Sequence, residues 1–485
     1  MAIRVNHRLT ARGLRPQIER LFALSAGKIL ELERTWNPAH GAPVFTVNGR
    51  YTARGWTDWT QGFQHGSALL QFDATGDPRF LQLGRRGTIE HMAGHVSHTG
   101  VHDHGFNNIS TYGNLWRLMR EGRLARDERE RDFYELALKV SGAVQAARWT
   151  RRLDGGYLHS FNGPHSLFID TMRSLRSLAV AHQLGHVLLA EQDQRVSLLQ
   201  RLVEHAETTA RYNIYYGEGR DLYDVCGRVA QEAIFNVASG HYRCPSTQQG
   251  YSPFSTWTRG LAWAVTGFAE QLEFLATLPE AELAAVLAPD AKPGCGRRVT
   301  KARRTGPRET ETPTRTPDQV DRMFLRAATA TGDYYLAVAC ANGIPMWDTG
   351  APNLHRLGDY GNKPADPFNR WEPVDSSAAA VAAQGLIRLG NYLCRRRQRR
   401  RGICYRQAGL TIAHTLFAEP YLATDTRHQG LILHSVYHRP NGWDRGPPGQ
   451  RVPNGESSLW GDYHARELAL LILREARGEP YPTFY

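Results

Sequence analysis

Apolar residues recur at helical spacing along most of this chain. Ile18, Phe22, Ile29 and Leu32 follow one another at intervals of three, four or seven residues, as on a helix with one buried face. Similar segments lie near residues 14–34, directly after Trp59, and near 78–96, 104–121, 128–149, 166–186, 193–212, 255–277, 318–340, 374–389, 404–418 and 457–475. Alternating runs of β-branched residues are scarce. The pattern therefore predicts an all-α fold of about twelve helices.

Two short motifs suggest how these helices are connected. Thr75-Gly76-Asp77 and Thr331-Gly332-Asp333 have the composition of turns. A turn that recurs between helices fits helix hairpins repeated around a ring. We therefore expect a toroid of six hairpins, an (α/α)6 barrel, formed by residues 1–485 as a single domain.

Composition places the chain among globular proteins. It has 485 residues, 41% of them hydrophobic, and eleven tryptophans, which predicts a large core and aromatic clefts. No apolar run reaches the roughly 18 residues of a membrane helix, and the N-terminal residues lack the apolar core of a secretory signal. The six cysteines form no C-x-x-C pair, so we expect free thiols and a cytoplasmic protein.

The formal net charge of +12 is concentrated in two basic tracts, near residues 283–317 and 394–406. Such runs bind nucleic acid in some proteins, but they are more often solvated loops. We interpret both tracts as solvent-exposed, insert-like segments. No nucleic acid and no membrane is expected as a partner.

Histidines are concentrated between residues 91 and 104: His91, His95, His98, His102 and His104. His91 and His95 have the i, i+4 spacing of a zinc site, but Met92 stands where the zincin pattern requires glutamate. No further ligand has a suitable spacing. We therefore predict neither a metal nor an organic cofactor.

The most informative stretch is Ser246–Trp263, STQQGYSPFSTWTRGLAW. Its glycine, proline and serine residues predict a loop, and helical spacing begins near Ser255. Tryptophan rings stack on sugars, arginine forks onto carboxylates, and glutamine bonds hydroxyl groups. The alternative interpretation is a buried aromatic helix start that carries a surface arginine.

The segment from Gln249 to Trp263 resembles the Q-G-Y-x-x-x-S-x-W-x-R-G-x-A-W signature of unsaturated glucuronyl hydrolases, glycoside hydrolase family 88. The resemblance extends from about Trp56 to Leu471, interrupted by the two basic tracts. It implies an (α/α)6 barrel whose cleft is lined by loops and helix N-termini at one end.

The resemblance also implies two catalytic carboxylates. Asp103 lies in His102-Asp103-His104-Gly105-Phe106, which resembles the family motif H-D-x-G-F, and Asp170 lies in a segment similar to that of the general acid/base. Read alone, Asp103 is equally a helix N-cap and Asp170 a helix-dipole partner. We expect the charge of Asp103 and a dry cleft to keep Asp170 protonated.

Further positions are implied to bind substrate: Trp59, Gln231, Gln249, Trp257, Arg259, Trp263 and Tyr437. Gln231 occupies the place of a histidine that contacts substrate in the family. Glutamine keeps hydrogen bonds but carries no titrating proton. Phe161 stands roughly where relatives often have tryptophan.

The implied substrate is an oligosaccharide that ends in a Δ4,5-unsaturated uronic acid, the product of a polysaccharide lyase. Hydration of the C4=C5 enol ether would release the unsaturated sugar. Three alternatives remain open: an unsaturated rhamnogalacturonyl hydrolase, a sugar 2-epimerase using His102, His104 or His434, and an inactive carbohydrate-binding protein. The neighbouring sugar and the oligomeric state are undetermined by the sequence.

Overall fold

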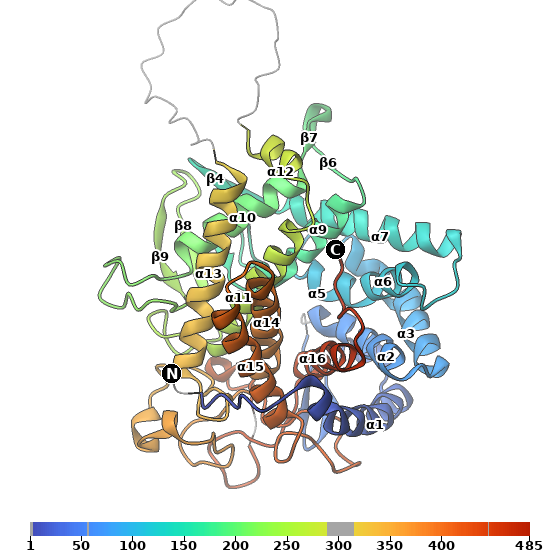
Figure 1. Ribbon diagram of the computed structural model, residues 1–485, viewed down its shortest axis with the longest axis vertical. Coiled ribbons are helices and arrows are strands. Elements are labelled where there is room, and N and C mark those ends of the chain that lie inside the picture. The colour runs from blue at the N-terminus through green and yellow to red at the C-terminus, as the bar shows by residue number, and fades with distance from the viewer. Residues whose placement is uncertain (1–2, 56–57, 289–314, 445) are drawn as a thin grey trace, which may run out of the picture.

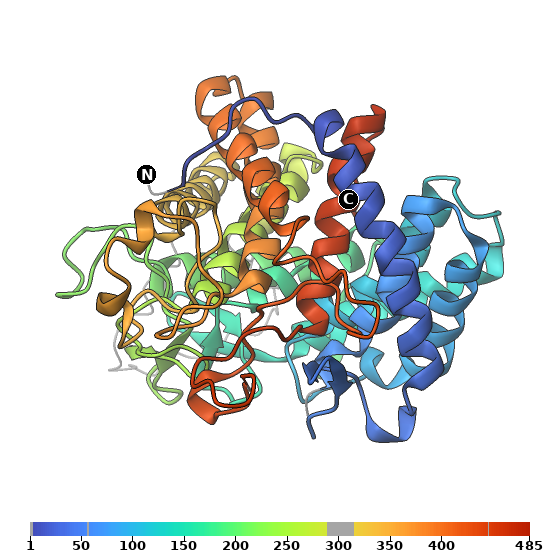
Figure 2. The same cartoon turned by 90° about the horizontal axis from the view of Figure 1, so that it is seen from below.

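The protein consists mainly of helices (Figures 1 and 2), and the contacts between them define two concentric rings. The computed structural model describes residues 3–55, 58–288, 315–444 and 446–485. The inner ring comprises α2 (Gln61–Thr75), α5 (His104–Asn108) with α6 (Asn114–Arg120), α8 (Thr171–Ser174) with α9 (Arg176–Gln183), α11 (Thr258–Leu275), α14 (Ser376–Arg395) and α16 (Leu459–Arg477). The outer ring comprises α1 (Ala11–Thr35), α3 (Pro78–His91), α7 (Glu128–Ala147), α10 (Leu198–Tyr212), α13 (Pro317–Val338) and α15 (Arg399–Leu416). The predicted (α/α)6 barrel is confirmed.

The hydrophobic pattern explains the two rings. In α1, buried residues such as Leu14, Ile18 and Leu21 form one face, as expected for an outer helix that packs on one side only. Every residue of α11 is buried, and nearly all of α14 is. A helix that is buried all round must lie inside the protein, so α11 and α14 belong to the inner ring.

The inner helices all begin at one end of the barrel. The residues immediately before them are Thr60, Asp103, Asp170, Trp257, Asp375 and Ser458. Each outer helix carries the chain back, so the inner helices run in the same direction. Loops and helix N-termini therefore meet at this end, and the predicted site residues are gathered there.

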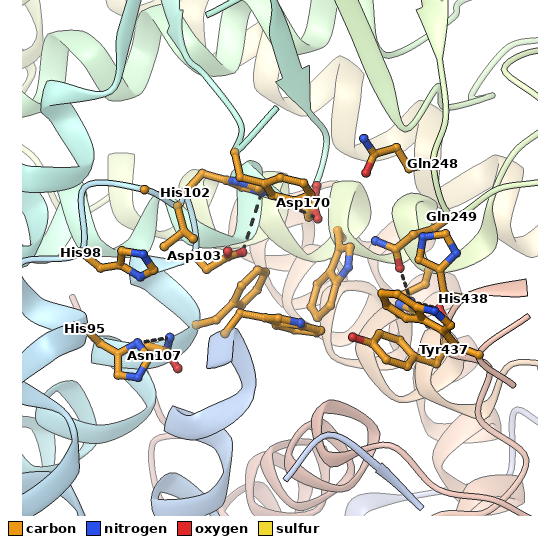
Figure 3. A pocket seen from close by; sticks show the side chains of 18 of the residues that line it. His95, His98, His102, Asp103, Asn107, Asp170, Gln248, Gln249, Tyr437 and His438 are labelled. Carbon is orange, nitrogen blue, oxygen red and sulfur yellow. Dashed lines mark hydrogen bonds and ion pairs between the residues drawn. The ribbon is translucent and has the colours of Figure 1, made fainter. Parts of the chain in front are cut away.

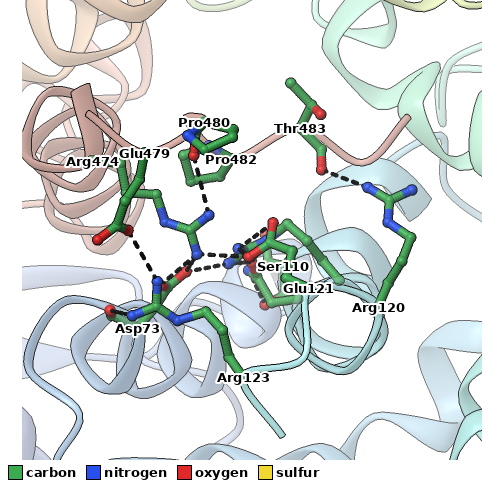
Figure 4. A network of polar contacts seen from close by, with 12 residues as sticks. Asp73, Ser110, Arg120, Glu121, Arg123, Arg474, Glu479, Pro480, Pro482 and Thr483 are labelled. Atoms are coloured by element: carbon green, nitrogen blue, oxygen red, sulfur yellow. Dashed lines mark hydrogen bonds and ion pairs between the residues drawn. The ribbon is translucent and has the colours of Figure 1, made fainter. Parts of the chain in front are cut away.

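The opposite end is closed by ion pairs and by the C-terminal segment (Figure 4). Asp73 is fully buried and lies 2.7 Å from Arg117 and 2.6 Å from Arg474. The segment after α16 crosses nearby, where Arg120 donates to the carbonyl of Thr483 at 3.1 Å. These contacts tie the first and last inner helices together.

Short strands occur in the connections. β5 (Ser166–Phe168), β8 (Glu232–Phe235) and β9 (Tyr242–Ser246) form an antiparallel sheet in the order β5-β8-β9. The other pairs are β1 (Phe45–Val47) with β2 (Arg50–Thr52), β3 (Trp149–Arg152) with β4 (Gly155–Leu158), and β6 (Leu188–Leu189) with β7 (Arg195–Val196). The periodicity of the sequence did not predict these strands, because each is too short to show alternation.

Two local predictions were wrong. The segment 166–186 is not one helix: strand β5 comes first, and α8 begins only at Thr171. Thr331-Gly332-Asp333 is not a turn but lies inside α13. Gly332 is there because a Cβ would lie 3.2 Å from the ring of Tyr405, so the helices pack closely at this point. Thr75-Gly76-Asp77, by contrast, does connect α2 to α3, with Gly76 at φ 74°.

The second basic tract, 394–406, is largely exposed but mainly helical, since α15 begins at Arg399. Most of the first tract lies outside the described residues, as does Trp56. Five cysteines are described, and all are free thiols. Two further short helices are α4 (Ala93–Val96) and α12 (Glu280–Leu287). No helix in the described ranges has the length and apolar character needed to cross a membrane.

Candidate active site

A cavity of about 600 Å³ opens at the end of the barrel where the inner helices begin (Figure 3). Its aromatic lining consists of Trp59, Phe106, Phe161, Trp257, Trp263, Tyr437 and Trp443. Its polar lining includes Asp103, Asp170, Asn107, Gln248, Gln249, Arg259 and four histidines. Cavities of this size that combine aromatic walls with a few polar groups are typical small-ligand sites.

The two predicted carboxylates face this cavity from neighbouring helix ends. Asp103 precedes α5 and Asp170 precedes α8, yet neither side chain caps its helix. The Oδ1 atom of Asp170 is buried and has no hydrogen-bond partner among the described residues. The N-cap hydrogen bond considered for Asp103 is therefore not made.

His102 lies between the two carboxylates. Its Nε2 atom is 3.8 Å from Asp103 Oδ1 and 3.9 Å from Asp170 Oδ2. The ring is 1% exposed, stacks on Phe161 at 5.8 Å, and has no hydrogen-bond partner for either nitrogen within the described part of the chain. A buried imidazole between two carboxyl groups is placed to exchange a proton with them.

Electrostatics couples these three groups. Burial lowers the pKa of His102, but the charge of Asp103 and the nearby Asp170 carboxylate raise it more, so the net shift is upward. Burial also raises the pKa of Asp103; His102 opposes this shift and the like charge of Asp170 adds to it. The expectation that the charge of Asp103 and a dry cleft act on Asp170 did not include His102, which lies within 4 Å of both carboxylates.

Two of the other histidines near His102, His95 and His104, have structural partners. His95 lies 2.7 Å from Gln61 Oε1 and 2.9 Å from Asn107 Nδ2. His104 contacts Ser141 at 3.0 Å and the carbonyl of His98 at 2.8 Å. Within the described ranges, His, Cys, Asp and Glu form no cluster of three or more suited to a metal ion.

Six of the seven predicted substrate-binding residues line the cavity: Trp59, Gln249, Trp257, Arg259, Trp263 and Tyr437. They come from different parts of the chain. Trp59 stacks on Trp460 of α16 at 5.2 Å, and Trp263 packs against Phe106 at 5.0 Å. The rings hold one another in place, so the cavity walls are preformed surfaces for a sugar ring.

Arg259 is 1% exposed and already bound by protein groups. Its guanidinium donates to Gln249 Oε1 at 2.6 Å and to the carbonyl of Tyr437 at 2.9 Å, and also to the carbonyl of Val436. It lies 3.3 Å from Asp375 Oδ2. The expected free fork for a substrate carboxylate is thus engaged in joining the loop before α11 to residues 436–437.

Gln231 is the predicted substrate contact that does not line the cavity. Its side-chain oxygen accepts hydrogen bonds from the backbone amides of Gln248 and Gln249, at 2.7 and 2.9 Å. The structure therefore places Gln231 behind the cavity-lining loop. Matching the position to the family's histidine could not reveal this, because direction depends on the tertiary fold.

Sequence reasoning missed several lining residues: His95, His98, Asn107, Gln248, His438 and Trp443. It also missed the position of His102 between the carboxylates. The sequence placed His102 directly before Asp103, within the H-D-x-G-F-like motif and the histidine cluster. No signal linked it to Asp170, which lies 68 positions later.

The fold and site together define a helical toroid with a carboxylate pair in an aromatic, sugar-sized cleft. No family model matches the chain. It is similar to curated unsaturated glucuronyl hydrolases. That of Formosa agariphila is 22% identical over 415 residues, covering 84% of this chain and 78% of the relative. That of Bacillus sp. strain GL1 is 23% identical over 446 residues, covering 90% and 91%.

Solved structures share the fold. An unsaturated glucuronyl hydrolase specific for heparin superposes with a TM-score of 0.68 at 18% identity, covering 96% of this chain and all of that one. The enzyme from Streptococcus agalactiae gives a TM-score of 0.66 at 18% identity, covering 98% and 94%. The similarity to curated relatives confirms the predicted resemblance to unsaturated glucuronyl hydrolases, and the solved structures confirm the predicted fold.

Proposed function

We propose that this protein is an unsaturated glucuronyl hydrolase, which releases a Δ4,5-unsaturated uronic acid from the end of an oligosaccharide. The observation that carries the proposal is the Asp103–His102–Asp170 group, which faces a 600 Å³ cavity walled by aromatic rings. The similarity to relatives of this name over 84–90% of the chain supports it.

The chemistry needs a proton and a water molecule. The C4=C5 bond of the substrate is part of an enol ether, so protonation at C4 places positive charge on C5 and the ring oxygen. Water then adds at C5, and the resulting hemiketal opens and releases the neighbouring sugar. One carboxyl group serves both steps, first as acid toward C4 and then as base toward water. These reaction steps require no cofactor.

We assign the proton transfers to Asp170. Its partly buried carboxylate faces the cavity, and His102 Nε2 lies 3.9 Å from Oδ2. His102 serves as the proton store, because the two neighbouring carboxylates raise its pKa and so stabilise the imidazolium form. The carboxylate of Asp103, whose Oδ1 lies 3.8 Å from His102 Nε2, stabilises the positive charge of the imidazolium. This arrangement keeps a proton beside Asp170 when substrate excludes water.

We assign sugar binding to the aromatic walls and to the Gln248–Gln249 loop. Structures of similar enzymes hold dGlcA-Glc-Rha-Glc and dGlcA-GalNAc6S, so we infer the same class of substrate here, an oligosaccharide that begins with an unsaturated glucuronate.

We also propose a single catalytic domain, because the C-terminal segment contacts α6 through Arg120 and α14 through Arg388. The free thiols agree with a cytoplasmic location.

The epimerase alternative fits the structure less well. Of the three histidines that the sequence offered for it, His102 lines the cavity, whereas His104 and His434 do not. His434 packs instead against Phe368 and Tyr421, at 5.0 and 5.7 Å. The direct test is incubation with a panel of lyase-made disaccharides. Loss of the ultraviolet absorbance of the double bond supports hydration, whereas intact absorbance across the panel rejects it.

Asp103→Asn tests the coupled group. The raised pKa of His102 depends partly on the charge of Asp103. Activity that needs this proton is present at low pH and lost as pH rises through the pKa. Removing the charge lowers that pKa, so the alkaline limb of the kcat/KM profile should move to lower pH. The profile should be measured between about pH 4 and pH 9, which brackets the ordinary histidine pKa.

Asp127→Asn is the matched control, because it removes one negative charge from an exposed helix cap that does not line the cavity. Asparagine caps a helix about as well as aspartate, so neither the limb nor the rate should change. A limb that stays in place in Asp103→Asn would contradict the coupling between Asp103, His102 and Asp170.

A further inference from the structure

The β5-β8-β9 sheet brings three distant segments to one edge of the cavity. Phe168 of β5 pairs with Glu232 of β8, and Glu232 pairs with Ser246 of β9. Because neighbouring strands are antiparallel, β5 and β9 end where β8 begins. Asp170 follows β5, Gln231 precedes β8, and Gln248 follows β9. The sheet thus places the proposed acid and the sugar-binding loop on either side of Gln231.

Gln231 is bonded to both neighbours. Its backbone carbonyl accepts from the amide of Ile169, the residue before Asp170, at 2.9 Å. Its side-chain oxygen accepts from Thr247 Oγ1 at 2.7 Å. The same oxygen accepts from the amides of Gln248 and Gln249, at 2.7 and 2.9 Å. With 3% of its surface exposed, Gln231 has little access to water that could replace these bonds.

Gln249 extends this hydrogen-bond network from Gln231 to Arg259. Its amide is held by Gln231, and its side-chain oxygen accepts from Arg259 at 2.6 Å. Gln248 and Gln249 both line the cavity. If the side-chain oxygen of Gln231 is removed, three donors lose their acceptor at once. The loop is then no longer fixed in position relative to the Asp170 segment.

We propose that Gln231 is a positioning residue that holds the Gln248–Gln249 loop in register with Asp170, rather than a substrate contact. The kinetic part of this proposal rests on the proposed function, whereas the structural part does not. An amide has no titrating proton, so the link is independent of pH. The essential atom is the acceptor oxygen, and any side chain that presents an acceptor there should preserve the loop.

Amide hydrogen exchange tests the structural part without substrate. In Gln231→Leu, exchange at Gln248 and Gln249 should accelerate on the order of 10–100-fold, because both amides lose a buried acceptor. In Gln231→Glu, a carboxylate oxygen accepts the same three bonds, so exchange should stay close to that of the wild type. Thr247→Val removes one donor to Gln231 and the acceptor of the Gly250 amide, but the amides of Gln248 and Gln249 keep Gln231, so the acceleration there should be smaller. This variant replaces Gln231→Leu if that variant fails to fold.

Gln71→Leu is the matched control. Gln71 is similarly buried, with 1% of its surface exposed, and donates to the carbonyl of Phe22 in another part of the barrel. This variant should leave the exchange of Gln248 and Gln249 unchanged even if its melting temperature falls. The proposal is overturned if both leucine variants accelerate the loop equally, if neither does, or if Gln231→Glu is as disruptive as Gln231→Leu.

Steady-state kinetics on an unsaturated disaccharide provides the second readout. Gln231→Leu should raise KM about tenfold or more and lower kcat less. The reason is that the loop binds the sugar, whereas the position of Asp170 is fixed by the helix that follows it. Gln231→Glu should restore KM. A wild-type enzyme without activity on any unsaturated disaccharide rejects the proposed function but leaves the exchange result decisive for Gln231.

Discussion

Asp170→Asn is expected to reduce kcat by at least 10²–10⁴-fold while the fold survives, since a general acid/base typically contributes that much. Asparagine has the same shape but holds no acidic proton, and the proposed reaction uses this proton in two steps. Oδ1 of Asp170 has no hydrogen-bond partner among the described residues, so the substitution breaks no observed bond there. The measurement is the rate of loss of double-bond absorbance, with circular dichroism and Tm as checks on folding.

Binding should persist in Asp170→Asn. The aromatic walls and the Gln248–Gln249 loop remain intact, so calorimetry should detect an unsaturated disaccharide with an affinity near the wild-type KM. Asp127→Asn again serves as the charge-matched control and should retain full activity. Near-normal turnover in Asp170→Asn would remove Asp170 from the role of proton donor and leave Asp103 as the remaining carboxylate.

Arg259→Lys is expected to lower kcat/KM by about 10–100-fold, equivalent to 1.4–2.8 kcal/mol. An ammonium cannot reproduce the planar fork that contacts Gln249, Tyr437 and Asp375 together. Because Arg259 and Asp375 are both buried, weakening the pair also destabilises the protein. Tm should therefore fall with activity, and kinetics should be measured well below the Tm of the variant.

The competing explanation is attraction of an anionic substrate by the whole basic surface. A variant with Arg395→Ser, Arg396→Ser and Arg397→Asn tests it; asparagine suits the φ of 62° at Arg397. Arg395 ends α14, 20 residues long, whose other end follows Asp375. At 1.5 Å per residue, the tract lies about 30 Å away, beyond the Debye length at physiological salt.

The surface variant should therefore keep kcat/KM within about twofold, as expected for screened charges. Added salt should likewise change KM little. If the surface variant loses more activity than Arg259→Lys, long-range attraction rather than local geometry governs binding.

Much of the architecture could be predicted because helices depend on local spacing. The stripe of Ile18, Phe22, Ile29 and Leu32 predicted α1 within a few residues of its observed bounds. The same reasoning failed at 166–186, where the sheet pairing of Phe168 with Glu232, 64 positions away, overrides local preference. It also failed at Gly332, where the reason for glycine is the nearby ring of Tyr405 on another helix.

The sequence by itself determined the residue types of the site: the carboxylates Asp103 and Asp170, and the aromatic and polar signature from Gln249 to Trp263. Only the tertiary structure decided what each residue faces. It placed His102 between the carboxylates, turned Arg259 onto protein acceptors, and put Gln231 behind the loop. The physical reason is that helical periodicity is set by residues within a few positions, whereas contacts across the barrel depend on how whole helices and strands pack.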